Sequence, residues 1–339
     1  MASHVYVYDP TSSDELSRVR GVGRYLQILR ENFADEFTFT SDLTEVPTSA
    51  TLINPFINFV KSPIVKKRLA KKQIGVIHDL IPLKYPEHFP LGIKGKFNVW
   101  QNKQLLKNYD RIITDSEHSK KDIIQILDIP DKKISVIYPI LPKIFRSKPT
   151  KNTIKIFPIE PVVDYFIYVG DVTWNKNLLN LARAVKQANV TIVCVGRAFT
   201  RKPSMNIEEV AFSEFMSEVQ GDKRFVFPGF VSDEDLISLY RGAVANILIS
   251  HDEGFGFSYL EAASCACPSI LADSPIFRET AADTALFAVP SDSNDIASKI
   301  SLLLGDQVLQ KKIGSAAQRR SKEFSSITFK KDFSKAISS

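Results

Sequence analysis

Val244-Ala-Asn-Ile-Leu-Ile249, followed directly by Ser250-His-Asp-Glu-Gly-Phe-Gly-Phe-Ser-Tyr-Leu-Glu261, is the stretch of sequence that decides the fold. Its first part is almost entirely apolar and predicts a parallel strand, because a strand that is covered on both faces has a continuous apolar run. The segment from about 258 to 265 predicts the helix that follows. A strand, a loop and a helix in this order indicate an α/β fold, in which ligands bind beyond the carboxyl ends of the strands.

The loop between this strand and this helix carries two glycines and leads to two glutamates. Gly254 and Gly256 allow the backbone to approach a ligand closely, because they have no Cβ atom. Glu253 is expected in the mouth of the loop. Glu261, on the first turns of the helix, can accept two hydrogen bonds from a vicinal diol such as a ribose. The alternative is a solvated loop acid and a helix-surface charge, since charged residues are mostly exposed.

Glu253-Gly-Phe-Gly-Phe-Ser-Tyr-Leu-Glu261 resembles the E-x7-E signature of retaining glycosyltransferases of family four. This resemblance implies the GT-B architecture, in which two Rossmann-like domains enclose a donor cleft. It also implies that Glu253 lies by the donor sugar and that Glu261 binds the ribose of the nucleotide. The residues of this motif that the resemblance assigns to donor binding are Gly254, Phe255, Gly256, Leu260 and Glu261.

Length, composition and charge limit the class of protein. At 339 residues the chain is long enough for two domains with a core each. It has no apolar run of ~20 residues and does not begin like a signal peptide, and its three cysteines are expected to be buried thiols, so a cytoplasmic protein is expected. A net charge of +6 favours an anionic partner. Nucleic acid is not expected, because the basic residues are not interleaved with stacking aromatics.

Two domains are expected from a change in composition. From 141 to 161 the chain is rich in Pro, Lys, Ser and Thr and has little periodicity, which indicates a linker. We therefore expect an N-terminal Rossmann-like acceptor domain over 1–150 and a C-terminal Rossmann-like donor domain over 151–320. The resemblance implies that the C-terminal helix, 321–339, packs back on the first domain.

A glycine pair follows the first predicted strand, His4 to Asp9. Gly21 and Gly23 lead into a helix that runs through Arg30. A strand, a glycine loop and a helix are the layout of a phosphate or sugar site, although two glycines at this spacing often only permit a tight turn. The resemblance places both glycines under the donor.

A strongly basic segment follows. Lys61 to Lys72 contains six basic residues and no acid, and it predicts a short helix with Pro63 in its first turn. This segment is either a solvated helix face or a surface that meets anionic lipid headgroups at the inner face of the cell membrane. Further along, 97–109 predicts a helix with Trp100 in the core.

The predicted buried strand from Ile74 to Ile81 ends in a polar pair, His78 and Asp79. A histidine at the carboxyl end of a strand faces the ligand region, whereas a histidine in mid-strand is more often packed in the core. His78-Asp-Leu-Ile-Pro resembles a family segment whose histidine lies near the donor sugar. Asp79 is expected either to orient the imidazole or to bind the acceptor. Ser116 is a predicted helix N-cap that borders the cleft in the family.

A lysine begins the first helix of the second half. Lys176 can neutralise a diphosphate, although an ordinary exposed lysine is the alternative. Gly170 and Lys176 resemble the family segment Tyr-Val-Gly-x5-Lys-Asn, whose lysine holds the donor phosphates. Many relatives carry an arginine just after this glycine or just before this lysine, where this chain has Asp171 and Asn175. Arg197, at the end of the next predicted strand, is the candidate for the missing cation.

These residues predict transfer of a hexose from a nucleotide-diphosphate sugar to a glycan or a lipid-linked glycan. Retention of the anomeric configuration is implied by the resemblance. GDP-mannose or dTDP-rhamnose is favoured as donor, and UDP-glucose stays open. No metal or other cofactor is expected, because no Asp-x-Asp near a strand end suggests a metal clamp. A non-catalytic GT-B partner that binds a sugar nucleotide or glycan, and a GT-B nucleotide-sugar epimerase, are the alternatives.

Overall fold

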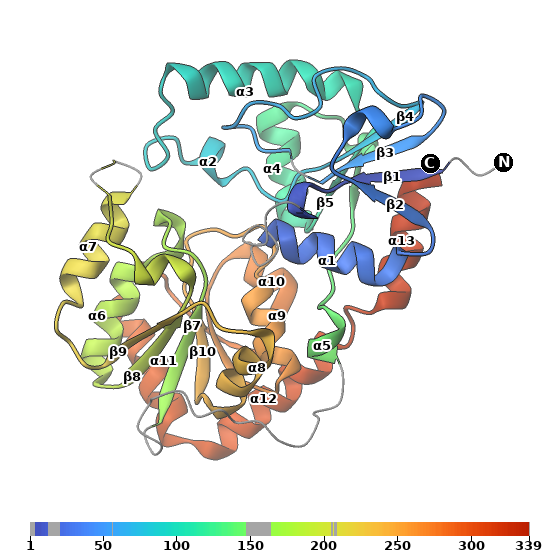
Figure 1. Cartoon of the computed structure of the whole chain (residues 1–339). Coiled ribbons are helices and arrows are strands. Elements are labelled where there is room, and N and C mark those ends of the chain that lie inside the picture. Colours follow the sequence, from blue (N-terminus) through green and yellow to red (C-terminus); the bar gives the residue numbers. More distant parts are fainter. Residues whose placement is uncertain are drawn as a thin grey trace. The chain divides into compact units, whose positions relative to one another are not determined.

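The computed structural model describes residues 4–12, 21–55, 57–146, 164–204, 206 and 209–338. The chain divides into two compact units, Met1–Pro142 with Phe324–Ser339 and Lys143–Glu323 (Figure 1). Each unit contains one six-stranded parallel sheet with helices around it, as predicted for an α/β fold. Most of the predicted linker, including the expected boundary at 150, lies outside the described residues.

The sheet of the first unit has the strand order β2-β1-β3-β4-β5-β6. Its strands are β1 (Val5–Tyr8), β2 (Phe37–Thr40), β3 (Thr51–Asn54), β4 (Lys72–Val76), β5 (Arg111–Thr114) and β6 (Ile134–Val136). The chain moves outward from β1 to β2 and then returns to the other side of β1. This reversal creates a switch point, and β4 and β5, which lie on its far side, are neighbours whose carboxyl ends share one edge.

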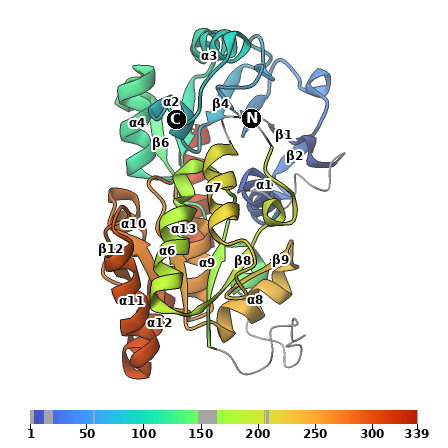
Figure 2. The same ribbon diagram turned by 90° about the vertical axis from the view of Figure 1, so that its left-hand side faces the viewer.

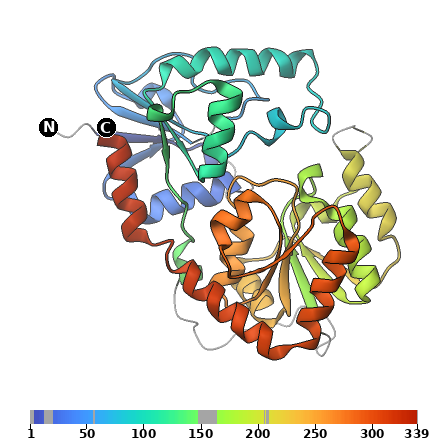
Figure 3. The same cartoon turned by 180° about the vertical axis from the view of Figure 1, so that it is seen from behind.

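Five α-helices surround this sheet in the described part of the unit. They are α1 (Gly21–Phe33), α2 (Ile81–Lys84), α3 (Ile93–Leu105), α4 (Glu117–Leu127) and α13 (Ser326–Ser338). The C-terminal helix α13 lies beside α1, as Figures 1 and 3 show. The rings of Phe333 and Phe329 are 5.3 and 6.1 Å from the ring of Phe33. The last helix of the chain therefore completes the core of the first unit.

The predicted helix between Lys61 and Lys72 is wrong. Residues 61–71 form bends and turns, and Lys72 begins β4. Side chains replace the helical hydrogen bonds here, because the Oε1 atom of Gln73 accepts from the backbone N–H of Leu69 and the Arg68 guanidinium donates to the carbonyl of Lys71. The segment is anchored by apolar side chains that enter the core, among them Val65 and Ala70.

The predicted core position of Trp100 is also wrong. The helix α3 begins at Ile93 rather than at 97, and its buried side chains are Asn98 and Asn102. Trp100 is 57% exposed.

No helix among the described residues is long and apolar enough to cross a membrane.

The sheet of the second unit has the order β12-β11-β10-β7-β8-β9. Its strands are β7 (Tyr165–Val169), β8 (Thr191–Val195), β9 (Phe225–Gly229), β10 (Ala245–Leu248), β11 (Ser269–Ala272) and β12 (Leu286–Ala288). Every residue of β10 is buried, which confirms the strand predicted from the apolar run. The neighbours β7 and β10 form the switch point, because the chain crosses from β9 at one edge back to β10.

The described residues of this unit contain eight α-helices. They are α5 (Lys143–Arg146), α6 (Leu178–Ala188), α7 (Val210–Glu218), α8 (Asp233–Gly242), α9 (Phe257–Ser264), α10 (Pro275–Ala281), α11 (Ser293–Gly305) and α12 (Gln307–Ser321). The helix α6 packs against α7 and α11, and α9 packs against α8 and α12 (Figure 2). The two sets cover opposite faces, because right-handed crossovers reverse their side of the sheet at the switch point.

Candidate functional site

Two loops of the second unit are joined at the switch point. They follow β7, over residues 170–177, and β10, over residues 249–256. The backbone N–H of His251 donates to the carbonyl of Asn175 at 2.7 Å, and the Asn175 amide donates to the carbonyl of Asp252 at 3.0 Å. The Asn177 amide donates to the carbonyl of Ile249 at 2.9 Å. The two loops therefore form one continuous surface at the carboxyl ends of these strands.

An ion pair between Lys176 and Glu253 connects these loops. The Nζ atom of Lys176 lies 2.7 Å from Oε1 of Glu253, and the hydroxyl of Ser250 donates to the same oxygen at 2.7 Å. The Glu253 side chain is only 12% exposed and that of Lys176 18%. Glu253 is therefore not a solvated loop acid, and Lys176 is not an ordinary exposed lysine. An anionic ligand that approaches Lys176 has to share it with Glu253 or displace Glu253.

Glu261 is the fifth residue of α9 and is only 4% exposed, so it is not a helix-surface charge. The hydroxyl of Tyr240 donates to its Oε2 atom at 3.3 Å, and this hydroxyl also lies 3.1 Å from Oγ of Ser258. Burial, together with the nearby Glu261 carboxylate, raises the pKa of Tyr240 well above its usual value. The tyrosine therefore stays protonated and serves as a hydrogen-bond donor to the glutamate.

The start of α9 requires a glycine. Gly256 caps this helix with φ = +89°, and a Cβ atom there would lie 2.8 Å from the ring of Phe277. Left-handed backbone of this kind is favourable for glycine alone. The side chains of Phe255 and Leu260 are 3% and 1% exposed. They pack in the interior, so Gly254 and Phe255 can meet a ligand mainly through their backbone.

The loops after β7 and β8 are also in close contact. A Cβ atom on Gly196 would lie 2.3 Å from the carbonyl oxygen of Gly170, so a glycine is needed at this crossing. Arg197 follows directly, is exposed, and forms no ion pair with any residue that the structure describes. Its neighbour Arg201 is instead paired with Glu209. Of these two arginines, Arg197 therefore has the uncommitted charge.

Asp171 and Asn175, where the sequence departs from many relatives, have local structural roles. The Oδ1 atom of Asp171 accepts from the backbone N–H of Val172 at 2.9 Å. Asn175 is 4% exposed, and its Oδ1 atom accepts from the hydroxyl of Thr173 at 2.8 Å while its amide bonds to the β10 loop. An arginine at 175 would not fit in this enclosed space. Asn175 therefore has a structural role in joining the two loops.

A histidine–aspartate pair lies at the carboxyl ends of β4 and β5 in the first unit. The Nδ1 atom of His78 is 2.6 Å from Oδ2 of Asp115, which is only 2% exposed. Burial is the largest single contribution and lowers the pKa of His78, but the Asp115 and Asp79 carboxylates and the backbone of Pro55 together outweigh it, so the pKa is raised. The ring of Tyr25, from α1, packs edge-on at 4.9 Å. The Nε2 atom is buried and forms no hydrogen bond of good geometry with a described residue, although the backbone of Pro55 lies near enough to help raise the pKa of the imidazole.

Asp115 therefore occupies the position at Nδ1 of the imidazole. The Oδ1 atom of Asp79 accepts from the backbone N–H of Ile81 at 3.1 Å and so supports the start of α2. Of the two roles expected for Asp79, the one at Nδ1 of His78 is taken by Asp115. Asp115 was missed, although it has the same signal as His78: a polar residue directly after an apolar strand.

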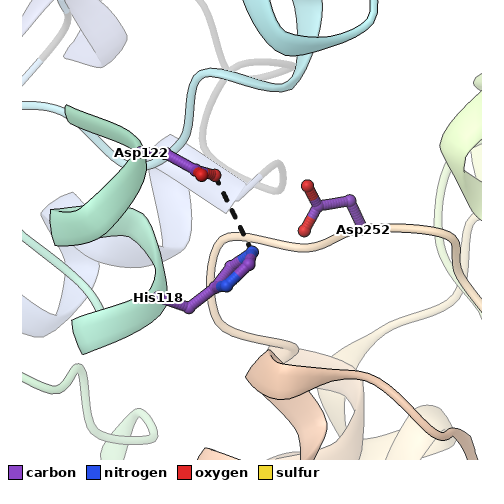
Figure 4. A group of neighbouring side chains, drawn as sticks. All are labelled: His118, Asp122 and Asp252. Atoms are coloured by element: carbon purple, nitrogen blue, oxygen red, sulfur yellow. Dashed lines mark ion pairs between the residues drawn. The ribbon is translucent and has the colours of Figure 1, made fainter. Parts of the chain in front are cut away.

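The predicted N-cap at Ser116 is confirmed. Its Oγ atom accepts from the backbone N–H of Ser119 at 3.0 Å, and the hydroxyl of Ser119 donates to the carbonyl of His78 at 3.0 Å. On the next part of α4, Oδ2 of Asp122 lies 2.9 Å from Nζ of Lys84 and 3.7 Å from Nε2 of His118. Figure 4 shows His118 and Asp122 one turn apart on this helix. The start of α4 is thereby bonded to the loop that carries His78.

Gly21 and Gly23 lie within the first turn of α1 rather than in a loop. Residues 13–20, which precede this helix, are outside the described part of the chain.

Two family models match this chain. Residues 150–320 match the family described as Glycosyl transferases group 1, and residues 4–141 match the Glycosyltransferase Family 4 domain. Among curated proteins, the chain is 28% identical over 237 residues to the O-antigen chain mannosyltransferase RfbU of Salmonella typhimurium, and 25% identical over 240 residues to the serotype-specific mannosyltransferase WbdA of Escherichia coli. These matches cover 68% and 66% of this chain, but they span only 61% and 29% of the length of the two relatives.

Solved structures share the fold at low sequence identity. HepE of Anabaena, crystallised in complex with UDP, has a TM-score of 0.72 and 15% identity, with 99% of both chains covered. A glycosyltransferase from Rickettsia africae has a TM-score of 0.68 and 16% identity, with 99% of this chain and 98% of that chain covered. The two parallel sheets and these neighbours show two Rossmann-like domains of the GT-B type. The expected family is confirmed: the chain belongs to the Glycosyl transferases group 1 family, with a Glycosyltransferase Family 4 domain before it.

Proposed function

We propose that this chain transfers a hexose from a nucleotide-diphosphate sugar to a glycan or lipid-linked glycan acceptor and retains the anomeric configuration. The observation that carries the proposal is the enclosed pair of Lys176 and Glu253 at the adjoining ends of β7 and β10, in a chain of this family. The mannosyltransferases among its relatives support a role in the synthesis of a cell-surface polysaccharide or glycoconjugate.

The proposed chemistry is mainly electrostatic. When the bond between the anomeric carbon and the β-phosphate oxygen breaks, negative charge develops on the leaving diphosphate, and cations that are already in place stabilise it. Lys176 is the proposed first cation and Arg197 the second. Glu253, once it shares Lys176 with the phosphates, faces the electron-poor sugar. The proposal needs neither a metal nor another cofactor.

The remaining donor contacts follow the motif. Glu261 accepts hydrogen bonds from the ribose hydroxyls, supported by the Tyr240 hydroxyl on its other oxygen. Backbone groups near the switch point meet the sugar and the phosphates, and these proposed donor contacts are Gly170, Gly254, Phe255, Gly256 and Leu260. Gly21 and Gly23 are proposed donor contacts of the first unit.

His78 is the proposed catalytic residue of the first unit, beside the donor sugar. Its Nδ1 atom is engaged by Asp115, so the buried Nε2 atom is the one that can bond to substrate. Asp79 and Ser116 are the proposed acceptor-side residues.

The curated relatives favour GDP-mannose as donor, since their names describe mannosyl transfer. A dTDP-rhamnose donor is the next choice, and UDP-glucose is tested as well because HepE was also crystallised with UDP-glucose. We propose action in the cytoplasm at the inner face of the cell membrane. The exposed basic segment Lys61 to Lys72 would contact anionic lipid there.

Calorimetric titration with UDP, GDP, dTDP and their common sugars, followed by an assay of sugar release, tests this function. We expect one nucleotide to bind and its sugar to be released slowly. Glu253→Ala should abolish transfer and keep the fold, and near-normal turnover in this variant would remove Glu253 from the site. Failure of every nucleotide to bind would contradict the proposal, and tight binding without turnover on any acceptor would favour a non-catalytic partner.

A further inference from the structure

The helix α3 exposes its apolar side chains and buries polar ones. Ile93 is 91% exposed, Phe97 53% and Trp100 57%, whereas Asn98 and Asn102 are 6% and 7% exposed. The helix forms an outer edge of the first unit in Figure 1. A helix of a globular domain normally does the reverse, with its apolar stripe in the core.

Hydrogen bonds explain the polar inner side of α3. The amide of Asn102 donates to the carbonyl of Lys61 at 2.9 Å and to that of Phe59 at 3.4 Å. The amide of Asn98 donates to the carbonyl of Val60 at 3.1 Å. These bonds satisfy the irregular backbone of residues 58–62 and hold it against the helix. These bonds explain why polar side chains are buried on the inner face of α3. They do not explain why apolar side chains are exposed on its outer face.

The outer face is a single stripe. Ile93, Phe97 and Trp100 are spaced i, i+4 and i+7, which places them on one side of a helix. The rings of Phe97 and Trp100 stack with their centroids 5.7 Å apart. A contiguous exposed apolar stripe indicates an interaction site, whereas single residues do not.

The surroundings of the stripe are uniformly basic. Residues 57–72 contain six lysines or arginines, residues 88–109 contain four lysines, and neither segment contains an aspartate or glutamate. Several of these lysines are exposed and form no ion pair with any described residue: Lys61, Lys66, Lys67, Lys71, Lys94 and Lys96. A groove of about 290 Å³ lies between the two segments, with Lys61 and Lys94 in its lining.

We propose that the outer face of α3 and the basic segment Lys61 to Lys72 together form a membrane-docking face. This face inserts Ile93, Phe97 and Trp100 among the headgroups of an anionic bilayer. Exposed aromatic and aliphatic side chains beside lysines combine burial of apolar area with attraction to anionic lipid, the two contributions that bind a protein surface to the membrane interface. Indole rings favour this region, and the lysines are attracted to anionic headgroups. A second copy of this face is a poor partner, because it would oppose like charges. The inference deepens the lipid contact of the proposed function, on which it rests, by adding the apolar stripe of α3 to the basic segment.

Flotation of the full chain with vesicles tests the docking face. Vesicles of phosphatidylcholine alone are compared with vesicles that also contain phosphatidylglycerol, at low and high salt. We expect binding to the anionic vesicles only, and weaker binding at high salt because the Debye length falls from about 10 Å at 0.1 M to about 3 Å at 1 M. Trp100 fluorescence should shift to the blue on binding, and Trp100→Phe should keep the binding and lose this part of the shift.

Variants separate the apolar and basic contributions. Phe97→Ser with Trp100→Ser should weaken vesicle binding at least about tenfold. Lys94→Gln and Lys96→Gln should each weaken it by roughly fivefold, the factor that corresponds to the usual contribution of one lysine near an anionic surface. Val308→Ser and Lys311→Gln, which change an exposed apolar residue and an exposed lysine on α12, should have no effect.

The proposal is overturned if wild-type protein does not float with anionic vesicles, or if the Phe97 and Trp100 double variant floats as well as wild type. It is also overturned if ultracentrifugation shows a dimer that this variant dissociates, since the face would then bind a second copy. Nucleotide titration of the same variants keeps the two proposals apart. If wild-type protein binds no nucleotide, the proposed donor chemistry is contradicted, but the result of the vesicle experiment still applies to the docking face.

Discussion

Glu253→Gln tests whether the enclosed ion pair stabilises the ligand-free donor site by holding Lys176 in place. The substitution keeps the shape of the side chain and removes the charge opposite Lys176. At 2.7 Å and an effective dielectric constant of about 20, the attraction between the two charges is about 6 kcal/mol, part of which is offset by desolvation. Neutralising one partner of a largely buried pair costs about 3 to 5 kcal/mol, because the other charge stays enclosed.

The second unit should therefore lose about 3 kcal/mol of unfolding free energy, the lower end of this range, since neither side chain is fully buried. For a domain of this size, such a loss lowers Tm by roughly 6 to 12 °C. Lys186 and Glu218 provide a matched control in the same unit. Their atoms Nζ and Oε1 are 2.6 Å apart, but the side chains are 31% and 30% exposed. Glu218→Gln should therefore cost less than about 1 kcal/mol.

Scanning calorimetry of both variants, with and without the nucleotide that binds, is the assay. A diphosphate supplies a new counterion to Lys176, so it should restore part of the stability of Glu253→Gln and bind at least as tightly as to wild type, while sugar release is lost. Equal destabilisation by Glu253→Gln and Glu218→Gln would refute the reasoning about burial. Weaker nucleotide binding in Glu253→Gln would refute the assignment of Lys176 as the cation that Glu253 restrains.

Three further changes test the site. The pKa of His78 is raised, because Asp115, together with Asp79 and the backbone of Pro55, outweighs burial. These interactions therefore stabilise the fold fully below pH 6.5 and less as pH rises through the raised pKa. Asp115→Asn should remove most of this slope from a series of thermal melts, and an unchanged slope would contradict the pairing. Asn175→Arg should lower Tm and weaken nucleotide binding, because Asn175 is 4% exposed and an arginine side chain does not fit there. A stable variant that binds the nucleotide more tightly would show that the space around residue 175 admits an arginine as the second phosphate-binding cation. Gly256→Ala should lower the free energy of unfolding in urea by about 1 to 3 kcal/mol. Gly305→Ala is the control and should not lower it, because a Cβ atom there meets nothing within 4 Å. Similar effects of the two substitutions would contradict the steric argument.

The sequence by itself determined the elements whose signals are local. The buried strand β10 was predicted from an apolar run, and the N-cap at Ser116 was predicted because such a cap bonds only a few positions ahead. The repetition of such strands and helices was enough for the fold class. The motif from Glu253 to Glu261 placed both glutamates at the end of one strand, because a single loop and helix carry them.

Only the tertiary structure decided which partners these residues have and which faces are covered. Asp115 meets His78, and Lys176 meets Glu253, because neighbouring parallel strands bring together residues that are far apart in the chain. The exposure of Trp100 was predicted wrongly for the same reason. Spacing along a helix shows which side chains share a face, but the neighbouring backbone decides which face is buried, and at α3 the carbonyls of residues 58–62 select the asparagines.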